Sequence, residues 1–151
     1  MNDLIVIEPK ELSTRDKVNA LEAMMREMGP VEFPVTHHFG PGVYARELFI
    51  PKGSLIVGKI HKYPQINIMS CGDLSVLTEE GIQRVQAPFT IVSPAGTKRI
   101  AYAHEDTVWT TIHGTHETDL DKIESDLIAQ NDQEYEEFCK LTGETKCLGS
   151  Q

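Results

Sequence analysis

The stretch of sequence that decides the fold runs from residue 53 to residue 72 and reads Gly53-Ser-Leu-Ile-Val-Gly-Lys59-Ile-His61-Lys-Tyr63-Pro-Gln65-Ile-Asn-Ile-Met-Ser-Cys71-Gly72. It contains two short runs of mainly apolar and β-branched residues, 55–61 and 65–70, and a glycine stands at each of its ends. Short runs of this composition between turn residues are typical of β-strands. The stretch therefore predicts two consecutive strands.

The same pattern continues on both sides, from about Val31 to Gly114. Clusters of Gly, Pro and acidic residues separate short runs rich in Val, Ile, Thr and aromatic residues, as turns separate strands. The runs that we predict as strands are residues 43–50, 55–61, 65–70, 74–77, 82–86, 89–92, 98–103 and 108–113. A series of short strands at regular spacing indicates a β-sandwich or barrel, and this series suits a jelly roll.

An amphipathic helix is predicted before the strands, where Ser13 or Thr14 can cap a helix that ends at Gly29-Pro30. Its apolar residues recur at spacings of three and four: Val18, Leu21, Met25 and Met28. This spacing places them on one face of the helix, which we expect to dock on the barrel.

A second helix is predicted after the strands, because Asn131 and Glu134 form a capping box and Gly143 provides a stop. We therefore divide the chain into an amino-terminal segment with a helix (1–30), a β-barrel (31–114) and an acidic helical segment (115–151). All three belong to one structural domain, since no linker is long enough to separate them.

Composition limits the classes of function. The chain has 151 residues, and its formal net charge of −9 argues against nucleic acid as a partner, since that binding depends on Lys and Arg. We find no apolar run long enough to span a bilayer and no secretory signal, so we expect no membrane partner and a cytoplasmic location. The cysteines Cys71, Cys139 and Cys147 fit free thiols in a reducing compartment, and we expect Cys71 to be buried.

The stretch from Gly53 to Gly72 resembles the first cupin motif, G-x5-H-x-H-x3-4-E-x6-G, at every spacing. Lys59 stands at the first histidine of the motif, His61 at the second, and Gln65 at the glutamate. The resemblance implies a cupin fold, a double-stranded β-barrel of the jelly-roll type. The fold class that we predict is therefore mainly β, a single cupin barrel with flanking amino- and carboxyl-terminal helices.

The segment 88–103 resembles the second cupin motif, G-x5-P-x-G-x2-H-x3-N, and keeps its Pro94-Ala-Gly96 turn. Arg99 replaces the histidine, and Ala103 replaces the asparagine. Several longer stretches, including residues 42–51 and 105–113, resemble small cupin proteins carried by bacteriophages. This resemblance implies a phage-encoded protein that acts in the host cytoplasm.

Cupin enzymes hold iron, manganese, nickel or zinc with the histidines and the glutamate of these motifs, so the resemblance implies a metal site that has lost ligands. Lysine and arginine offer protons and positive charge instead of lone pairs. Three interpretations follow. A remaining transition-metal shell would use His61, Gln65 and His113, with Tyr63 nearby.

Alternatively, Lys59, His61 and Arg99 line one mouth of the barrel and select a carboxylate or phosphate, with Tyr63 and Gln65 as further ligand-binding residues. A third interpretation is that Lys59 and Arg99 only form ion pairs, for instance with Glu47 or Asp106, that tie strands together.

The functional prediction is a non-catalytic cupin with a degenerate metal motif and no cofactor, which acts in binding or assembly. One alternative is a metal-dependent enzyme of the dioxygenase or isomerase type. The other is a protein that binds a small anionic ligand, such as a nucleotide or sugar acid. We expect a homo-oligomer, a dimer or larger, because exposed sheet edges favour association, and a phage or host protein is a further expected partner.

Overall fold

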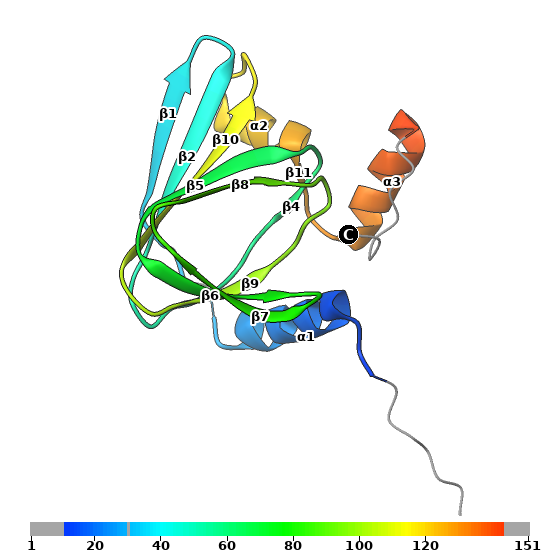
Figure 1. Cartoon of the computed structure of the whole chain (residues 1–151). Helices are drawn as coiled ribbons and strands as arrows, with labels where there is room; N and C mark the ends of the chain where they lie inside the picture. The colour runs from blue at the N-terminus through cyan, green and yellow to red at the C-terminus, as the bar shows by residue number, and fades with distance from the viewer. Residues whose placement is uncertain (1–10, 30, 144–151) are drawn as a thin grey trace, which may run out of the picture.

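The computed structural model describes residues 11–29 and 31–143 (Figure 1). Its elements are α1 (Thr14–Glu27), β1 (Val35–Gly40), β2 (Val43–Ile50), β3 (Leu55–Val57), β4 (Ile60–His61), β5 (Gln65–Cys71), β6 (Asp73–Thr78), β7 (Gly81–Gln86), β8 (Phe89–Ser93), β9 (Ile100–Ala103), β10 (Thr107–Gly114), α2 (Leu120–Leu127), β11 (Ile128–Ala129) and α3 (Asp132–Thr142).

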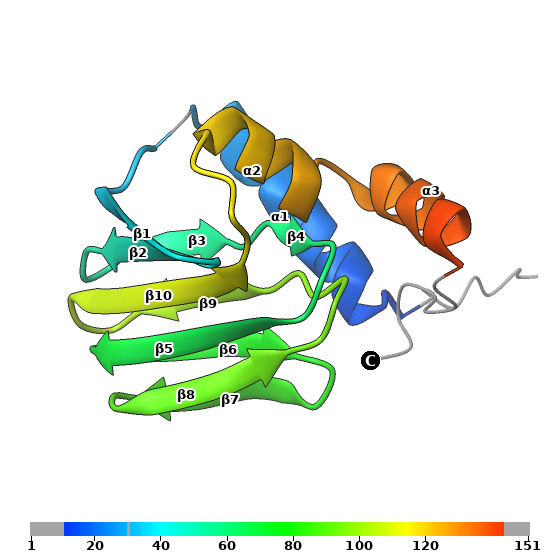
Figure 2. The same cartoon turned by 90° about the horizontal axis from the view of Figure 1, so that it is seen from above.

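The strands form two facing antiparallel sheets and a short strand pair. The larger sheet has the order β1-β2-β10-β5-β8, and the smaller has the order β3-β9-β6-β7. In both sheets most neighbours are distant in sequence, as in a jelly roll. Figures 1 and 2 show the two sheets enclosing a common interior, with helices on one side. The predicted mainly β, jelly-roll fold with flanking helices is confirmed.

The apolar core fills one half of this interior. Its buried members are Leu48, Ile50, Met69, Leu74, Val76 and Ala103. They come from β2, β5, β6 and β9, so both sheets contribute to it. The other half of the inner face carries polar side chains, which form the candidate site.

Two motif glycines are needed because other groups approach them closely. A Cβ atom on Gly72 would lie 2.1 Å from Thr107 Oγ1, and one on Gly96 would lie 2.6 Å from the ring of Tyr135. Both glycines also have positive φ, +113° and +79°, which L side chains rarely adopt. The motif spacing therefore reports real steric requirements of this fold.

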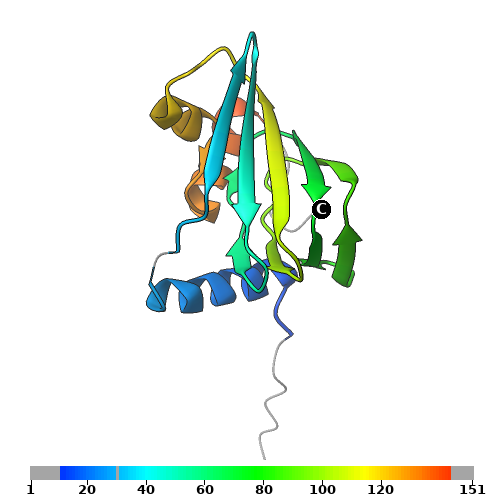
Figure 3. The ribbon, with the colours of Figure 1, turned by 90° about the vertical axis from the view of Figure 1, so that its left-hand side faces the viewer.

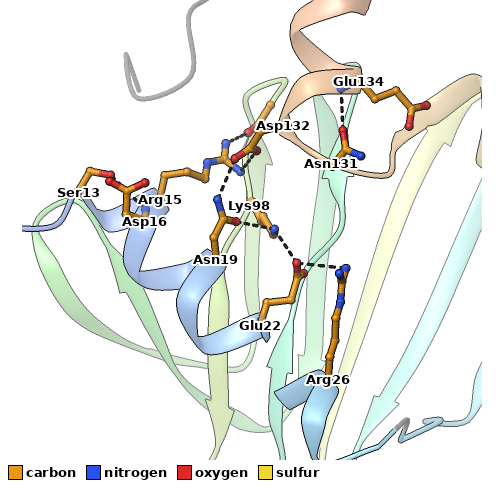
Figure 4. Close-up of polar contacts among 11 residues, drawn as sticks. Ser13, Arg15, Asp16, Asn19, Glu22, Arg26, Lys98, Asn131, Asp132 and Glu134 are labelled. Carbon is orange, nitrogen blue, oxygen red and sulfur yellow. Dashed lines mark hydrogen bonds and ion pairs between the residues drawn. The ribbon is translucent and has the colours of Figure 1, made fainter. Parts of the chain in front are cut away.

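Helix α1 lies against the small sheet and is attached mainly by polar contacts (Figures 1 and 4). Ser13 caps it, as predicted, by accepting a hydrogen bond from the Asp16 N–H. Arg15 donates a hydrogen bond to the Gly96 carbonyl and pairs with Asp132 of α3 at 3.5 Å. Val18 is the one residue of α1 that is fully buried.

Three sequence predictions are wrong in detail. Met28 does not dock on the barrel, because it is 85% exposed. The strand predicted at 55–61 is broken into β3 and β4 by Gly58 and Lys59. Cys71 is exposed, because the register between β5 and β10 shifts beside Val108 and turns the end of β5 outward.

The remaining predictions concern the other two cysteines and the two ends of α3. Cys139 is buried on α3 as a free thiol, whereas Cys147 lies outside the described residues. Asn131 caps α3 by accepting from the Glu134 N–H at 2.8 Å, and Gly143 ends it with a φ of +73°. The predicted Asn131 cap and glycine stop are thus confirmed, whereas the Glu134 carboxylate accepts from the Gln130 N–H, one residue before the position that a capping box requires.

Candidate functional site

The polar half of the interior is built by strands that place polar residues in neighbouring registers. Gln65 of β5 pairs with Ser93 of β8, and Asn67 pairs with Thr111 of β10. Thr111 in turn pairs with Arg46 of β2. Because cross-strand partners share one face of a sheet, these side chains point into the same interior.

A buried hydrogen-bond network fixes the floor of this site. The Asn67 Oδ1 atom accepts from Thr111 Oγ1 at 2.8 Å and from Trp109 Nε1 at 3.2 Å. Its Nδ2 group donates to Ser93 Oγ at 2.8 Å, and Arg99 Nη1 donates to the same oxygen at 3.0 Å. Asn67 therefore joins three strands of the large sheet and positions Arg99 through Ser93.

Two histidines lie side by side above this floor. The rings of His61 and His113 are stacked, with centroids 5.0 Å apart and an interplanar angle of 21°. Burial lowers the pKa of His61 to about 3, and electrostatic interactions with His113 (when it is protonated), Arg46 and Lys59 act in the same direction. Burial also lowers the pKa of His113. Both imidazoles are therefore neutral at physiological pH.

Two guanidinium groups lie in the same polar half of the interior. Burial lowers the pKa of Arg99, but arginine keeps its charge in proteins. Arg46 lies on the same inner face and lies near enough to lower the pKa of His61. Among the described residues, neither arginine forms an ion pair with a carboxylate. The interior of this acidic chain is thus locally positive.

The rim of the site is closed by the segment after the barrel. Strand β11 pairs with β4, so that Ile128 lies opposite His61. Lys59, which is half-exposed, pairs with Glu124 of α2 at 2.8 Å. Lys59 is therefore a rim residue with a carboxylate partner, although that partner is neither Glu47 nor Asp106.

The structure brings together most of the residues that the sequence suggested. His61, Gln65, His113 and Arg99 all reach the polar interior, and Lys59 lies at its edge. Tyr63 does not join them, because its ring packs edge-on against Phe138 of α3, with centroids 5.4 Å apart. Arg46, Asn67 and Ser93 were not identified from the sequence, and only the alternation within their strands could have indicated them.

Two buried polar atoms of the site have no partner among the described residues, namely His61 Nδ1 and Gln65 Oε1. Gln65 is only 5% exposed. Buried polar atoms normally form hydrogen bonds, because leaving one unpaired costs about 1–3 kcal/mol. The described residues therefore leave two polar atoms of the site unsatisfied.

The donor chemistry does not match a transition metal well. In the part of the chain that the structure describes, no group of three or more His, Cys, Asp or Glu side chains is arranged to hold a metal ion. His61, His113 and Gln65 would supply two imidazoles and one neutral amide, while Arg46 and Arg99 would repel a dication. These residues fit an anion better than a metal.

Comparisons with known proteins leave the family of this chain open. No family model matches the sequence, and no curated protein matches it. The chain is similar in structure to KdgF from Halomonas sp., with 19% identity, a TM-score of 0.47 and coverage of 62% of this chain and 89% of that one.

A putative ethanolamine utilization protein, EutQ, from Salmonella typhimurium is also similar, with 14% identity, a TM-score of 0.48 and coverage of 59% and 74%. A cupin-2 domain protein from Shewanella frigidimarina has 12% identity, a TM-score of 0.46 and coverage of 62% and 92%. Because these similarities are low, the jelly-roll fold rests here on the strand order itself. Among the described residues, no helix is long and apolar enough to span a membrane.

Proposed function

We propose that this chain is a non-catalytic binding protein that takes a small anion at the polar end of its barrel. The observation that carries the proposal is the pair of guanidinium groups, Arg46 and Arg99, on an inner face where neither forms an ion pair with a described carboxylate. Glu124 at the rim, whose pKa is lowered mainly by Lys59, nevertheless lies near enough to Arg46 for that pKa to be lowered further. A guanidinium binds a carboxylate or phosphate through two parallel hydrogen bonds, which favours these groups as ligands. Nucleotides and sugar acids carry such groups.

The neutral residues of the site support the same proposal. Gln65 Oε1 and His61 Nδ1 are buried without partners, so each is available to a polar group of the ligand. Asn67 and Ser93 hold the Arg99 side chain in place before a ligand arrives. Such preorganisation reduces the entropy that binding would otherwise cost.

The same residues argue against catalysis. A general acid or base works best with a pKa near the operating pH, whereas burial holds the pKa of His61 at about 3. The Ser93 hydroxyl oxygen accepts hydrogen bonds from Asn67 and Arg99, and neither partner is a base that would activate it as a nucleophile. The site is thus better suited to holding a ligand than to transforming it.

A thermal-shift screen tests the proposal, with phosphate, citrate, gluconate and adenosine monophosphate as probes. We expect at least one probe to raise Tm progressively with concentration, because ligands that bind the folded state stabilise it. Arg46→Gln and Arg99→Gln should each weaken that probe about tenfold, the loss of one charge-assisted contact. Lys52→Gln, at an exposed position (67% of its side chain is accessible), is the control and should change nothing.

Elemental analysis provides an independent test. Near-stoichiometric transition metal that disappears in His61→Ala would overturn the proposal in favour of a metalloenzyme. A flat thermal response across all probes would refute the proposal that the ligand is a small anion. Equal binding by both arginine variants and the unaltered chain would refute it as well.

We also infer a homo-oligomer, encoded by a phage and acting in the host cytoplasm. The phage origin rests on the sequence resemblance alone. The assembly is supported by the outer face of the large sheet, which no helix covers in Figure 3 and which exposes Ile66 (42%) and Val92 (65%). Exposed apolar side chains on neighbouring strands are typical of contact surfaces.

A further inference from the structure

The outer face of the large sheet is apolar over most of its width. Alternation along the strands sends Arg46, Asn67 and Thr111 into the barrel, so the residues between them point outward. The outward-facing residues of β10, β5 and β8 that pair across the strands are Val108, Thr110, Ile112, Ile66, Ile68, Thr90 and Val92. None of these seven side chains carries a charge.

The outer face of the small sheet has the opposite character. Asp73 and Arg84 form an ion pair there at 2.7 Å, and Gln86 donates a hydrogen bond to Asp73 at 3.0 Å. Beside them, Ser75 Oγ and His104 Nε2 share a hydrogen bond at 2.6 Å. A polar outer face is usual for an antiparallel sheet with one side in water. The outer face of the large sheet instead has the composition of a surface that is covered.

Charge on the outer face of the large sheet is confined to one edge. Glu47 of β2 and His38 of β1 point outward and lie 3.5 Å apart. From β10 to β8 the face continues without charge, and no described helix crosses it (Figure 3). The chain has a net charge of −9, so much of its surface repels a second copy. This face is where two copies approach with the least repulsion.

The size of the face is close to what a dimer needs. Its five strands, spaced about 4.8 Å apart and roughly six residues long at about 3.4 Å per residue, make a surface of about 24 by 20 Å. Two such surfaces in contact cover about 1,000 Å² in total, which is the lower limit for a specific protein interface. The face is therefore large enough for a second copy.

We propose that two copies of this chain pack face to face through the outer surfaces of their large sheets, about a twofold axis near Ile66 and Ile112. A twofold contact places the same surface on both sides, which suits an uncharged apolar face. The two sheets then lie about 10 Å apart, as in a β-sandwich. This inference rests on the homo-oligomer inferred above and names its contact surface. It is independent of the anion site, which lies on the inner side of β5.

Light scattering after size exclusion tests the proposal on full-length variants. Ile66→Glu and Val92→Glu each introduce a carboxylate from both copies into the apolar contact, and each should raise the dissociation constant of the dimer at least about a hundredfold. Ile66 and Val92 are 42% and 65% exposed, so both variants should fold, which urea unfolding verifies. Ile82→Glu is the matched control, because Ile82 is 73% exposed on the small sheet, and it should remain dimeric.

Ionic strength provides a second measurement. Added salt should strengthen the dimer, because it screens the repulsion between two chains that each have a net charge of −9. A dimer that salt weakens would depend on ion pairs across the contact, and this result would contradict the apolar interface.

The outcomes separate this surface from the proposals above. A monomeric unaltered chain would refute both the surface and the homo-oligomer. A dimer that persists in Ile66→Glu and Val92→Glu would refute the surface alone; pairing through the β1 edge would give this result, since β8 lies at the opposite edge. A trimer would refute the twofold axis. Loss of every anion response with the dimer intact would refute only the anion site.

Discussion

Acidification from pH 7.5 to pH 5.0 should destabilise the folded chain by about 2 kcal/mol through His61 alone. In the unfolded chain this imidazole takes up a proton near pH 6.5, whereas burial in the folded chain lowers its pKa to about 3. Between these two values the unfolded state binds more protons, so stability is present above pH 6.5 and is lost as the pH falls. The lowered pKa of His113 acts with the same sign.

Urea unfolding at the two pH values, followed through the fluorescence of Trp109, measures this loss, since Trp109 is the one tryptophan of the chain. With an m-value of about 2 kcal/mol/M, the midpoint should fall by roughly 1 M. Asp73, whose pKa is held at about 2 mainly by its hydrogen bond from Arg84, titrates below this window.

His61→Gln removes the titrating group, so its midpoint should change with pH by roughly 1 M less than that of the unaltered chain. His116→Gln, which removes an exposed histidine, is the control and should keep the full change. If His61→Gln and the unaltered chain lose the same stability on acidification, His61 is not held neutral by burial, and the electrostatic description of the site fails.

Three further predictions follow from packing. Gly72→Ala forces a Cβ atom onto Thr107 at positive φ and should cost about 2–5 kcal/mol, measured by urea unfolding; a loss under about 0.5 kcal/mol would contradict the close approach. Asn67→Leu leaves Trp109 Nε1 and Thr111 Oγ1 without their shared acceptor and should cost about 2–4 kcal/mol in the same assay, against little change for Ser70→Ala on the exposed end of β5. Light scattering after size exclusion should give at least twice the chain mass of 16.9 kDa, and a monomer at micromolar concentration would refute the assembly.

Fold and site differ in how far the sequence predicts them. Gly72 and Gly96 can be recognised from the sequence, because a side chain at Gly72 would collide with Thr107 and one at Gly96 would collide with Tyr135. Alternation along β2 indicates that Arg46 points inward, but its position beside Thr111 and Asn67 depends on a register that crosses from β2 through β10 to β5. Local spacing carries no information about such a register.

Cys71 illustrates a second limit. Strict alternation along β5 would place it on the inner face with Met69, but the register shift against β10 leaves it exposed. One irregular residue is enough to invert the direction of the side chains that follow it. Strand β11 shows a third limit, because two residues are too few to display any period.

The pairing of β4 with β11 affects the point during synthesis at which the candidate site becomes complete. The strand that carries His61 has Ile128 and Ala129 as its hydrogen-bonded partners, and these residues are synthesised after β10, the last strand of the two sheets. Until the segment through Ala129 has left the ribosome, β4 lacks its partner strand, and Tyr44 and Ile60 lack the apolar residues that bury them. We therefore expect the proposed anion site to be incomplete in a nascent chain up to that point.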